Sequence, residues 1–309
     1  MPTVGLGLWK IPNEKAADVT YSAIEAGYRL LDSACDYGNE KESGEGIRRA
    51  IDAGIVKREE LFVVSKLWNT FHRPENVKIG LQKTLADMGL EYLDLYLIHF
   101  PCPMKFVPIE TRYPPDSSEF DEEVTYQQTW EAMESLVDEG LVKHIGFSNV
   151  GKTLIEQVFS YAKVKPSVIQ NEMHPYLSQE ELLKASKGAG LVPMAYSPFG
   201  SLSYVELGDA TAEESVLELS AVKDIAIKHS KTPGQIVLRW GVQRGTTVIP
   251  KTSKKERLAE NLAIFDFVLS EEEMATISSL NKDKRYCDAS TWGTDYEAVI
   301  KPHFNPYVD

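Results

Sequence analysis

Eight short apolar runs recur along the chain, and this repetition constrains the fold more than any other feature. Runs of about four to eight residues, rich in branched and aromatic side chains, are typical of strands buried on both faces. Strands of this kind belong mostly to parallel sheets that are covered by helices. The runs are residues 4–8, 28–31, 61–65, 93–98, 143–147, 167–170, 191–196 and 246–250.

Longer stretches with helical spacing lie between and after these runs. Strands that alternate with helices form parallel β/α units, and eight such units close a (β/α)8 TIM barrel of the α/β class. The alternative is a doubly wound sheet, which usually carries a GxGxxG turn after its first strand. That position has only Gly5-Leu6-Gly7 here, with no third glycine. The helical stretches are residues 14–26, 74–89, 125–140, 154–162, 179–188, 216–230, 233–241 and 254–264.

One barrel domain can account for the whole of residues 1–309, because such barrels typically take up about 250 residues or more. Two interruptions are longer than ordinary connections, residues 100–125 after the fourth run and residues 198–214 after the seventh. Loops of this length inside a compact domain are more often functional than not.

The charge of the chain limits its partners. Asp and Glu number 46 against 33 Lys and Arg, a formal charge of −13, which argues against broad nucleic-acid binding. No apolar run reaches the roughly 20 residues that a membrane span needs. The 3 cysteines form no CxxC pair, which suits a reducing compartment. We therefore expect a cytoplasmic protein that acts on a small molecule, with no nucleic-acid or membrane partner and no metal.

Ionisable and polar residues interrupt the apolar runs at their carboxyl ends, where the active site of an α/β barrel lies. Each taken alone has an ordinary structural explanation, such as a helix cap or a buried hydrogen bond. Together they would face one another across the barrel mouth. They are Asp32 with Tyr37 in the loop after it, Lys66, His99, Ser148, Asn149, Gln170, Tyr196 and Lys251.

Four of these side chains suit the reduction of a carbonyl group. Tyrosine is a poor acid near neutrality, with an ordinary pKa of about 10, and a neighbouring ammonium group lowers that pKa. Asp32 would hold the Lys66 ammonium charged, and a neutral His99 could donate a hydrogen bond to the carbonyl oxygen. Tyr37 would then protonate the oxyanion as it forms. No protein side chain donates hydride, so a nicotinamide or flavin is implied.

Five motifs resemble the aldo-keto reductase superfamily, in the order that this family has them and over roughly residues 2–300. The departures are mild, with Leu30 where His is frequent and Ser33 where Thr is frequent. The motifs are residues 27–34 with 37–40 (GYRLLDSA and YGNE), 65–68 (SKLW), 97–99 (LIH), 145–149 (IGFSN) and 249–253 (IPKTS).

The resemblance implies a role for each site residue. Tyr37 is the general acid, Lys66 and Asp32 tune it, and His99 orients the substrate carbonyl. Ser148, Asn149 and Gln170 hold the nicotinamide carboxamide, while Tyr196 stacks on the ring. The family binds its dinucleotide without a Rossmann fold, which accounts for the missing glycine motif. The expected cofactor-binding residues are Ser148, Asn149, Gln170, Tyr196, Ser197, Glu206, Lys251, Thr252, Ser253, Arg257 and Asn261.

The cofactor is predicted from residues 251–257, which hold four cations in seven positions of an acidic chain. Cations at a helix N-terminus oppose the helix dipole, so they favour a bound anion. A 2′-phosphate supplies one, and Arg257 suits a bidentate contact. In the family these positions bind the adenosine phosphate of NADPH, with Asn261 at the adenine. We predict NADPH, with NADH possible because Glu206 resembles a glutamate of yeast-type xylose reductases that contacts the NAD ribose.

The substrate prediction also follows from resemblance. Residues 105–110 (KFVPIE) and Asp36 resemble yeast-type xylose reductases, in which the aspartate binds a sugar hydroxyl. Cys287 departs from that pattern, because xylose reductases carry a substrate-binding Asn at this position. Residues 236–243 and 248–261 resemble plant mannose-6-phosphate reductases. The predicted pocket walls are Trp9, Trp68 and Phe100, with Asp36, and the predicted substrate is an aldehyde, an aldose or a sugar phosphate.

Two other functions fit a barrel. A metal-dependent hydrolase needs several His or Asp ligands, and with His99 and His174 the set is incomplete. A non-catalytic barrel could bind NADPH as a sensor or subunit, although such a protein has no need of the Tyr37 proton donor. We expect a monomer or a homodimer. Barrels of this family usually begin with a hairpin that closes the floor, and here Met1 and Pro2 directly precede the first run, so we expect that hairpin to be missing.

Overall fold

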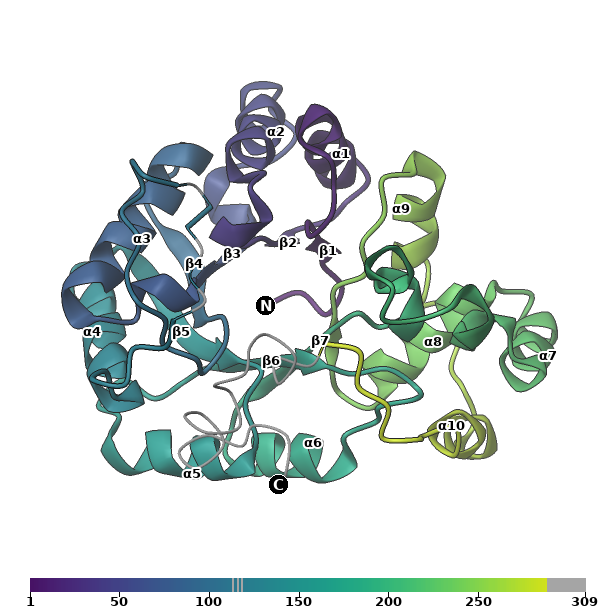
Figure 1. Cartoon of the computed structure of the whole chain (residues 1–309). Helices are drawn as coiled ribbons and strands as arrows, with labels where there is room; N and C mark the ends of the chain where they lie inside the picture. The colour runs from purple at the N-terminus through teal and green to yellow at the C-terminus, as the bar shows by residue number, and fades with distance from the viewer. Residues whose placement is uncertain (113, 116, 118, 288–309) are drawn as a thin grey trace.

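The computed structural model describes residues 1–112, 114–115, 117 and 119–287. Its strands form one 8-stranded parallel sheet in which each strand pairs with the next along the chain. Figure 1 shows the strands as a central ring with helices around it, which confirms the predicted (β/α)8 barrel. The strands are β1 (Leu6–Gly7), β2 (Leu30–Asp32), β3 (Phe62–Leu67), β4 (Leu93–Ile98), β5 (Val142–Ser148), β6 (Val168–Glu172), β7 (Val192–Tyr196) and β8 (Thr247–Val248).

The first and last strands close the ring. Val4 forms a parallel bridge with Val248, and the Gly7 amide donates to the Pro250 carbonyl at 3.1 Å. A Cβ atom on Gly7 would lie 2.8 Å from the Ile249 carbonyl oxygen, so only glycine allows β1 to approach β8 this closely. The closed ring leaves no free sheet edge between these two strands.

The helices begin and end where local sequence signals place them. Helix α3 has Pro74 at its first turn and ends at Gly89, whose φ of 65° lies in the left-handed region. Capping boxes at Thr125 and Thr232 start α4 and α8. The helices are α1 (Asn13–Glu25), α2 (Glu40–Asp52), α3 (Pro74–Met88), α4 (Tyr126–Asp138), α5 (Lys152–Tyr161), α6 (Glu180–Gly188), α7 (Ser220–His229), α8 (Pro233–Gln243), α9 (Lys255–Leu262) and α10 (Glu271–Ser278).

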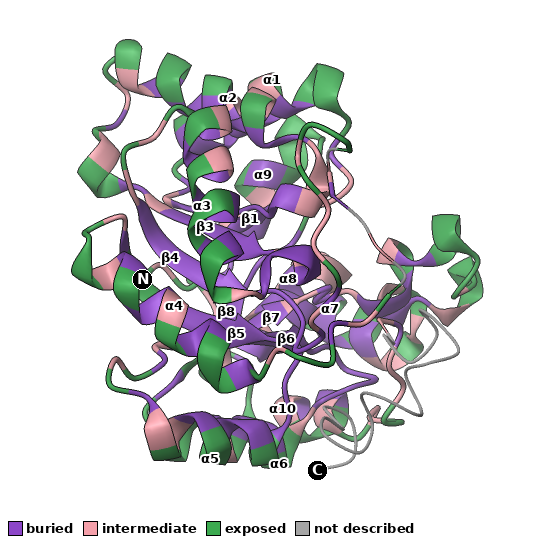
Figure 2. Cartoon of the chain, turned by 60° about the vertical axis from the view of Figure 1, so that its left-hand side comes forward, coloured by how far each residue is buried: buried purple, intermediate pink, exposed green. Residues whose placement is uncertain are grey.

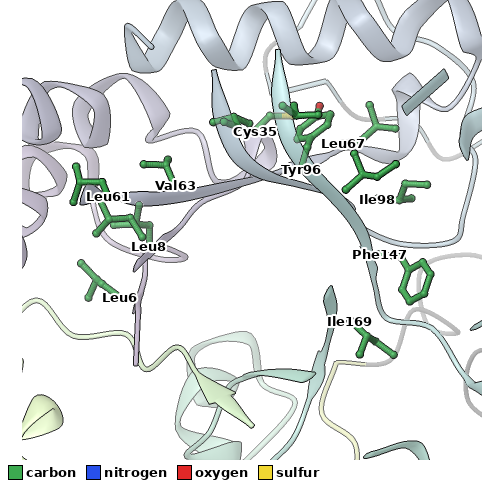
Figure 3. Close-up of a cluster of buried hydrophobic side chains, with 14 of the residues drawn as sticks. Leu6, Leu8, Cys35, Leu61, Val63, Leu67, Tyr96, Ile98, Phe147 and Ile169 are labelled. Carbon is green, nitrogen blue, oxygen red and sulfur yellow. The ribbon is translucent and has the colours of Figure 1, made fainter. Parts of the chain in front are cut away.

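Apolar side chains fill two layers. One cluster occupies the inside of the barrel, where Val64, Leu95 and Met194 are fully buried. A larger cluster lies between the strands and the helices, and Figure 3 shows part of it, including Val63 and Ile169. Figure 2 shows the same arrangement as buried strands within helices whose outer faces are exposed. Successive residues of β3 therefore point to opposite sides, which directs Lys66 inward together with Val64.

Some sequence-based boundaries were wrong. β3 continues to Leu67, so Lys66 lies within the strand rather than after it, and β8 is only Thr247–Val248. Helices α2 and α10 were not predicted. The long interruption at residues 198–214 contains three short 3-10 helices, which are Gly200–Ser203, Val205–Leu207 and Ala212–Glu214. No helix among the described residues has both the length and the apolar character to cross a membrane.

A buried carboxyl at the start of α2 makes the stability depend on pH. Glu40 accepts hydrogen bonds from the hydroxyls of Ser65 at 2.6 Å and Thr84 at 2.9 Å, and burial raises its pKa to about 7. Because the folded state binds this proton more tightly than the unfolded chain, the free energy of unfolding falls as pH rises from the ordinary carboxyl pKa to about 7. At about 1.36 kcal/mol per pKa unit the loss is roughly 3 kcal/mol.

We expect Glu40→Gln to remove this dependence, because the amide keeps the hydrogen bonds without a titrating proton. Urea unfolding of both proteins at pH 5 and pH 8 measures it. The variant should gain stability over the parent at pH 8 and not at pH 5, whereas an equal difference at the two pH values would contradict the prediction.

Candidate active site

A cavity of about 1000 Å³ lies at the carboxyl ends of the strands. Its wall includes residues from β2, β6 and β7, from the turns after β4 and β5, and from the long interruption at residues 198–214. Sixteen of the residues predicted for the site contribute to it: Trp9, Asp32, Asp36, Tyr37, Trp68, His99, Phe100, Asn149, Gln170, Tyr196, Ser197, Glu206, Lys251, Thr252, Arg257 and Asn261.

Lys66 lies behind Tyr37 and is completely buried. Its ammonium donates to Asp32 Oδ1 at 2.7 Å, to the Ser33 carbonyl at 2.8 Å and to the Tyr37 hydroxyl at 3.0 Å. These three acceptors use all three N–H groups of the lysine. Because the Tyr37 oxygen accepts from Lys66, the hydroxyl proton is left to be donated to a group in the cavity.

The pKa of Tyr37 differs from the sequence-based expectation. Burial raises it well above the ordinary value, and the Asp32 and Asp36 carboxylates add to that rise. The Lys66 ammonium still favours the phenolate, but desolvation and two nearby negative charges outweigh it, so the expectation of a lowered Tyr37 pKa was wrong for this arrangement. The phenol therefore keeps its proton at neutral pH, as a proton donor must. Lys66 is positioned to stabilise the phenolate that is left after the proton has been given.

His99 and the rings of Phe100 and Trp68 form one wall of the cavity beside Tyr37. The His99 ring packs on Phe100 at 4.8 Å between centroids and edge-to-face against Trp68 at 5.5 Å. Its Nδ1 atom lies 3.0 Å from Asp36 Oδ1. Phe100 also meets Trp68 edge-to-face. The His99 ring lies 5.9 Å from that of Tyr37, so His99 and its neighbour Asp36 lie beside Tyr37 against an apolar surface.

A second polar network crosses the ends of β5, β6 and β7. Tyr196 donates its hydroxyl to Asn149 Oδ1 at 2.6 Å, and Asn149 Nδ2 donates to the His99 carbonyl at 2.9 Å. Gln170 Nε2 donates to Asp32 Oδ2 at 2.7 Å, which connects this network with Lys66. Ser148 donates to the Gln170 carbonyl. Asn149 has a φ of 59°, a conformation that asparagine tolerates better than most residues.

The far end of the cavity is basic. Lys251, Arg257 and Asn261 line it where α9 begins, and Asn261 is buried while Arg257 is exposed. Lys251 and Arg257 form no salt bridge with any described residue, in contrast with Lys255, which pairs with Glu25 at 3.0 Å. Two cations without carboxylate partners at the start of a helix suit a bound phosphate.

Three predicted residues do not line the cavity. Lys66 and Ser148 are buried behind it, and Ser253 is exposed outside its wall. Sequence reasoning missed Lys10, which donates to the Ser203 carbonyl at 2.8 Å and lies 3.6 Å from Glu206. It also missed Tyr204, whose ring lies 5.8 Å from that of Trp9. Both contacts join segments almost 200 positions apart, so no local pattern announces them. Among the described residues, no three or more His, Cys, Asp and Glu side chains are grouped to hold a metal ion.

Comparison with known families decides the classification, because residues 3–282 match the model of the Aldo/keto reductase family. The chain belongs to the aldo/keto reductase family. The resemblance seen in the five motifs is thereby confirmed, and this aldo/keto reductase is an oxidoreductase.

Individual relatives of the chain are also named as reductases. The chain is 50% identical over 300 residues to the NAD(P)H-dependent D-xylose reductase of Pachysolen tannophilus, covering 94% of each protein. It is 48% identical over 308 residues to the NADPH-dependent D-xylose reductase of Candida boidinii, covering 97% of this chain and 96% of the relative. Among solved structures, the aldo-keto reductase of Bombyx mori in complex with NADP matches with a TM-score of 0.84 at 35% identity, over 100% of this chain and 95% of that one. The aldose reductase of Schistosoma japonicum matches with a TM-score of 0.83 at 40% identity, over 92% and 90%.

Proposed function

We propose that this aldo/keto reductase reduces the aldehyde of an aldose, D-xylose first among them, to the polyol with NADPH. The observation that carries the proposal is the Tyr37 hydroxyl, which accepts from the buried Lys66 ammonium and lies in the wall of the large cavity. Relatives at about half identity over almost the whole chain are named D-xylose reductases. We also propose that residues 1–309 act as one barrel domain, since the site draws on strands from β2 onward.

The proposed chemistry divides the work among the site residues. Tyr37 protonates the carbonyl oxygen as negative charge develops on it, and Lys66, held by Asp32, stabilises the phenolate that remains. His99 and Asp36 orient the sugar, His99 at the carbonyl and Asp36 at a hydroxyl group. Trp9, Trp68 and Phe100 keep water away from the reacting carbon. A bound reduced nicotinamide supplies the hydride.

The cavity suits a dinucleotide of this kind. It runs without a break from Tyr37 and His99 to Lys251 and Arg257, so one extended ligand can reach both ends. We propose that Asn149, Gln170 and Tyr196 hold the nicotinamide end, with Ser197 beside them. Ser148 supports Gln170 from behind the wall through its hydrogen bond to the Gln170 carbonyl. At the other end the proposed contacts are Lys251, Thr252 and Arg257 to the phosphate, Asn261 to the adenine and Glu206 to a ribose hydroxyl.

Arg257→Ala tests the preference for NADPH. We expect the KM for NADPH to rise about tenfold and the KM for NADH to change little, because only NADPH carries the phosphate that Arg257 would bind. Initial rates with each nucleotide at a fixed aldose concentration measure this. Lys255→Ala is the matched control, since Lys255 precedes Arg257 by two positions but pairs with Glu25 outside the cavity. An equal loss with both nucleotides in Arg257→Ala would contradict the assignment.

The function itself is tested by following NADPH absorbance with D-xylose, glyceraldehyde and mannose 6-phosphate. Turnover fastest with D-xylose supports the proposal, and turnover fastest with the sugar phosphate assigns the site to that substrate instead. Tight NADPH binding without turnover of any carbonyl compound would make the barrel a nucleotide-binding sensor or subunit.

The setting in which the enzyme works is also a proposal. None of the three cysteines, Cys35, Cys102 and Cys287, forms a disulfide, which accords with a reducing compartment such as the cytoplasm. We propose a small carbonyl compound or sugar as the partner of the site, and a monomer or homodimer as the working form.

A further inference from the structure

A buried carboxylate beside the cavity has no part in the proposed chemistry. Glu172 is the last residue of β6 and is completely buried, next to the wall of the site. The ion pairs among the described residues give it His174 as a partner at 2.8 Å and no lysine or arginine. A carboxylate without water or a strong cation is costly unless N–H groups satisfy it. The hydrogen bonds of Glu172 therefore indicate its role.

Those hydrogen bonds hold a distant segment of the chain. The Tyr286 amide donates to Glu172 Oε1 at 3.0 Å, and the Cys287 amide donates to Oε2 at 2.7 Å. Figure 1 shows this segment, in yellow, running back from α10 toward the ends of β6 and β7. Farther from the cavity, the backbone amides of Lys282 and Lys284 donate to the Tyr176 carbonyl, and the Lys284 ammonium pairs with Glu214 at 2.5 Å. At the cavity itself, Glu172 accepts from the backbone of the segment at two successive amides.

One of the two residues held in this way lines the cavity, and the other packs behind its wall. Cys287 lines the cavity. The Tyr286 ring stacks on Tyr204 at 5.5 Å with an angle of 15°, and Tyr204 in turn contacts Trp9. The Tyr286 ring also lies 5.5 Å from the His174 ring, measured between centroids. Moving the segment would therefore shift Cys287 and release the ring that supports Tyr204 and Trp9.

His174 completes the arrangement. It is completely buried and its ring lies against Gly200, where a Cβ atom would be 3.3 Å from the imidazole. Gly200 begins the long connection after β7, and its φ of 64° favours glycine independently. The Glu172–His174 pair thus contacts both the segment at Tyr286 and Cys287 and the start of the loop that carries Tyr204.

We propose that Glu172 is a positioning residue for substrate selection: its carboxylate fixes the cavity wall at Cys287 and, through the Tyr286 ring, at Tyr204, and so sets the affinity for the aldose. This inference rests on the proposed function for its substrate. It separates Glu172 from the proton-donating machinery, because its bonds lead to the wall and none leads to Tyr37, Lys66 or Asp32. Substitution should therefore change the KM for the sugar far more than it changes NADPH binding.

The test is Glu172→Gln. This substitution replaces one acceptor oxygen of the carboxylate by an NH2 group, which would face a backbone N–H donor and could not accept from it. We expect the KM for D-xylose to rise about tenfold, since hydrogen bonds to a charged group contribute more than neutral ones. We expect the dissociation constant for NADPH to stay within about twofold, since the basic end of the cavity lies elsewhere. The control is Glu134→Gln. Glu134 is also buried and accepts backbone N–H bonds, from Lys163 at 2.6 Å and Val164 at 2.9 Å, far from the cavity. An equal rise of KM in both variants would overturn the proposal.

Two further measurements test the positioning role of Glu172. Alkylation of Cys287 by iodoacetamide reads the position of the segment without turnover, because Cys35 and Cys102 are buried. Alkylation should be about tenfold faster in Glu172→Gln than in the parent or in Glu134→Gln. The loss of one hydrogen bond to a charged acceptor would raise the fraction of molecules in which the segment has moved away by about that factor. Unchanged alkylation overturns the proposal. If Glu172→Gln does not fold, Tyr286→Ala removes the stacked ring instead and should give the same rise in KM. If the parent enzyme reduces no aldose and alkylation is still faster in Glu172→Gln than in the parent, the proposed substrate is rejected and the positioning role of Glu172 is kept.

Discussion

Tyr37→Phe is expected to abolish carbonyl reduction and leave NADPH binding intact. The substitution removes one oxygen atom, which is the only hydroxyl within reach of the Lys66 ammonium in the structure described. A positioned general acid contributes about 10²- to 10⁴-fold to a rate, so kcat should fall by about a thousandfold. The KM for D-xylose should change much less, because Asp36, His99 and the aromatic walls remain. Steady-state kinetics and a fluorescence titration of NADPH measure the two effects.

The control for this prediction is Tyr92→Phe. Tyr92 directly precedes β4 at the opposite end of the barrel, where its ring packs on Arg58 at 4.1 Å and on Lys143 at 4.2 Å. Phenylalanine keeps those ring contacts, so kcat should stay near that of the parent. A Tyr37→Phe enzyme that retains more than a small fraction of the parent kcat would show that another group donates the proton, and His99 would be the next candidate.

The sequence predicted which side chains come together at the barrel mouth, because strand ends converge in a parallel barrel. Asp32, Lys66 and His99 belong to three consecutive strands, and the fold alone brings strand ends together at one mouth. The pairing of Lys66 with both Asp32 and Tyr37 follows from that geometry. What sequence could not give was the balance of burial and charge at Tyr37, since the pKa depends on how much water the finished cavity admits.

The sequence predicted less where glycine residues serve packing. Helix α2 was missed because Gly44 and Gly46 interrupt a stretch with few apolar residues. In the structure, a Cβ atom on Gly46 would lie 2.5 Å from the Ala17 carbonyl, and one on Gly44 would lie 2.3 Å from that of Met88. Both glycines let α2 approach its neighbours closely, although glycine in a helix interior is intrinsically unfavourable. The close approach is a tertiary contact, so the local spacing of apolar residues could not predict this helix.

The same limit applies to the residues that support the site from outside. Glu172 lies 114 and 115 positions from the amides it accepts from, and nothing near it in the sequence indicates that partner. His174 was considered only as a possible metal ligand, and in the structure its ring nitrogen pairs with Glu172 instead. The contacts between distant segments are thus the part of the site that the sequence alone did not predict.

Lys66→Met should have the second large effect, on both turnover and stability. Methionine fills a similar volume but leaves Asp32 as a buried carboxylate without its ammonium partner. Breaking a buried ion pair by removing one partner costs about 3–5 kcal/mol, so the free energy of unfolding should fall by that order. The rate should also fall by at least a hundredfold, because the phenolate of Tyr37 would form without a neighbouring positive charge. Urea unfolding and kcat measure the two losses.

The double variant Asp32→Asn with Lys66→Met separates these losses. It removes both charges together, and replacing a buried ion pair by uncharged groups is often neutral for stability. Asparagine can still accept from Gln170 Nε2, which lies 2.7 Å from Asp32 Oδ2. We therefore expect the double variant to recover most of the free energy of unfolding while kcat stays as low as in Lys66→Met. Recovery of kcat together with stability would mean that Lys66 only supports the fold, and that the Tyr37 proton is donated without help from its charge.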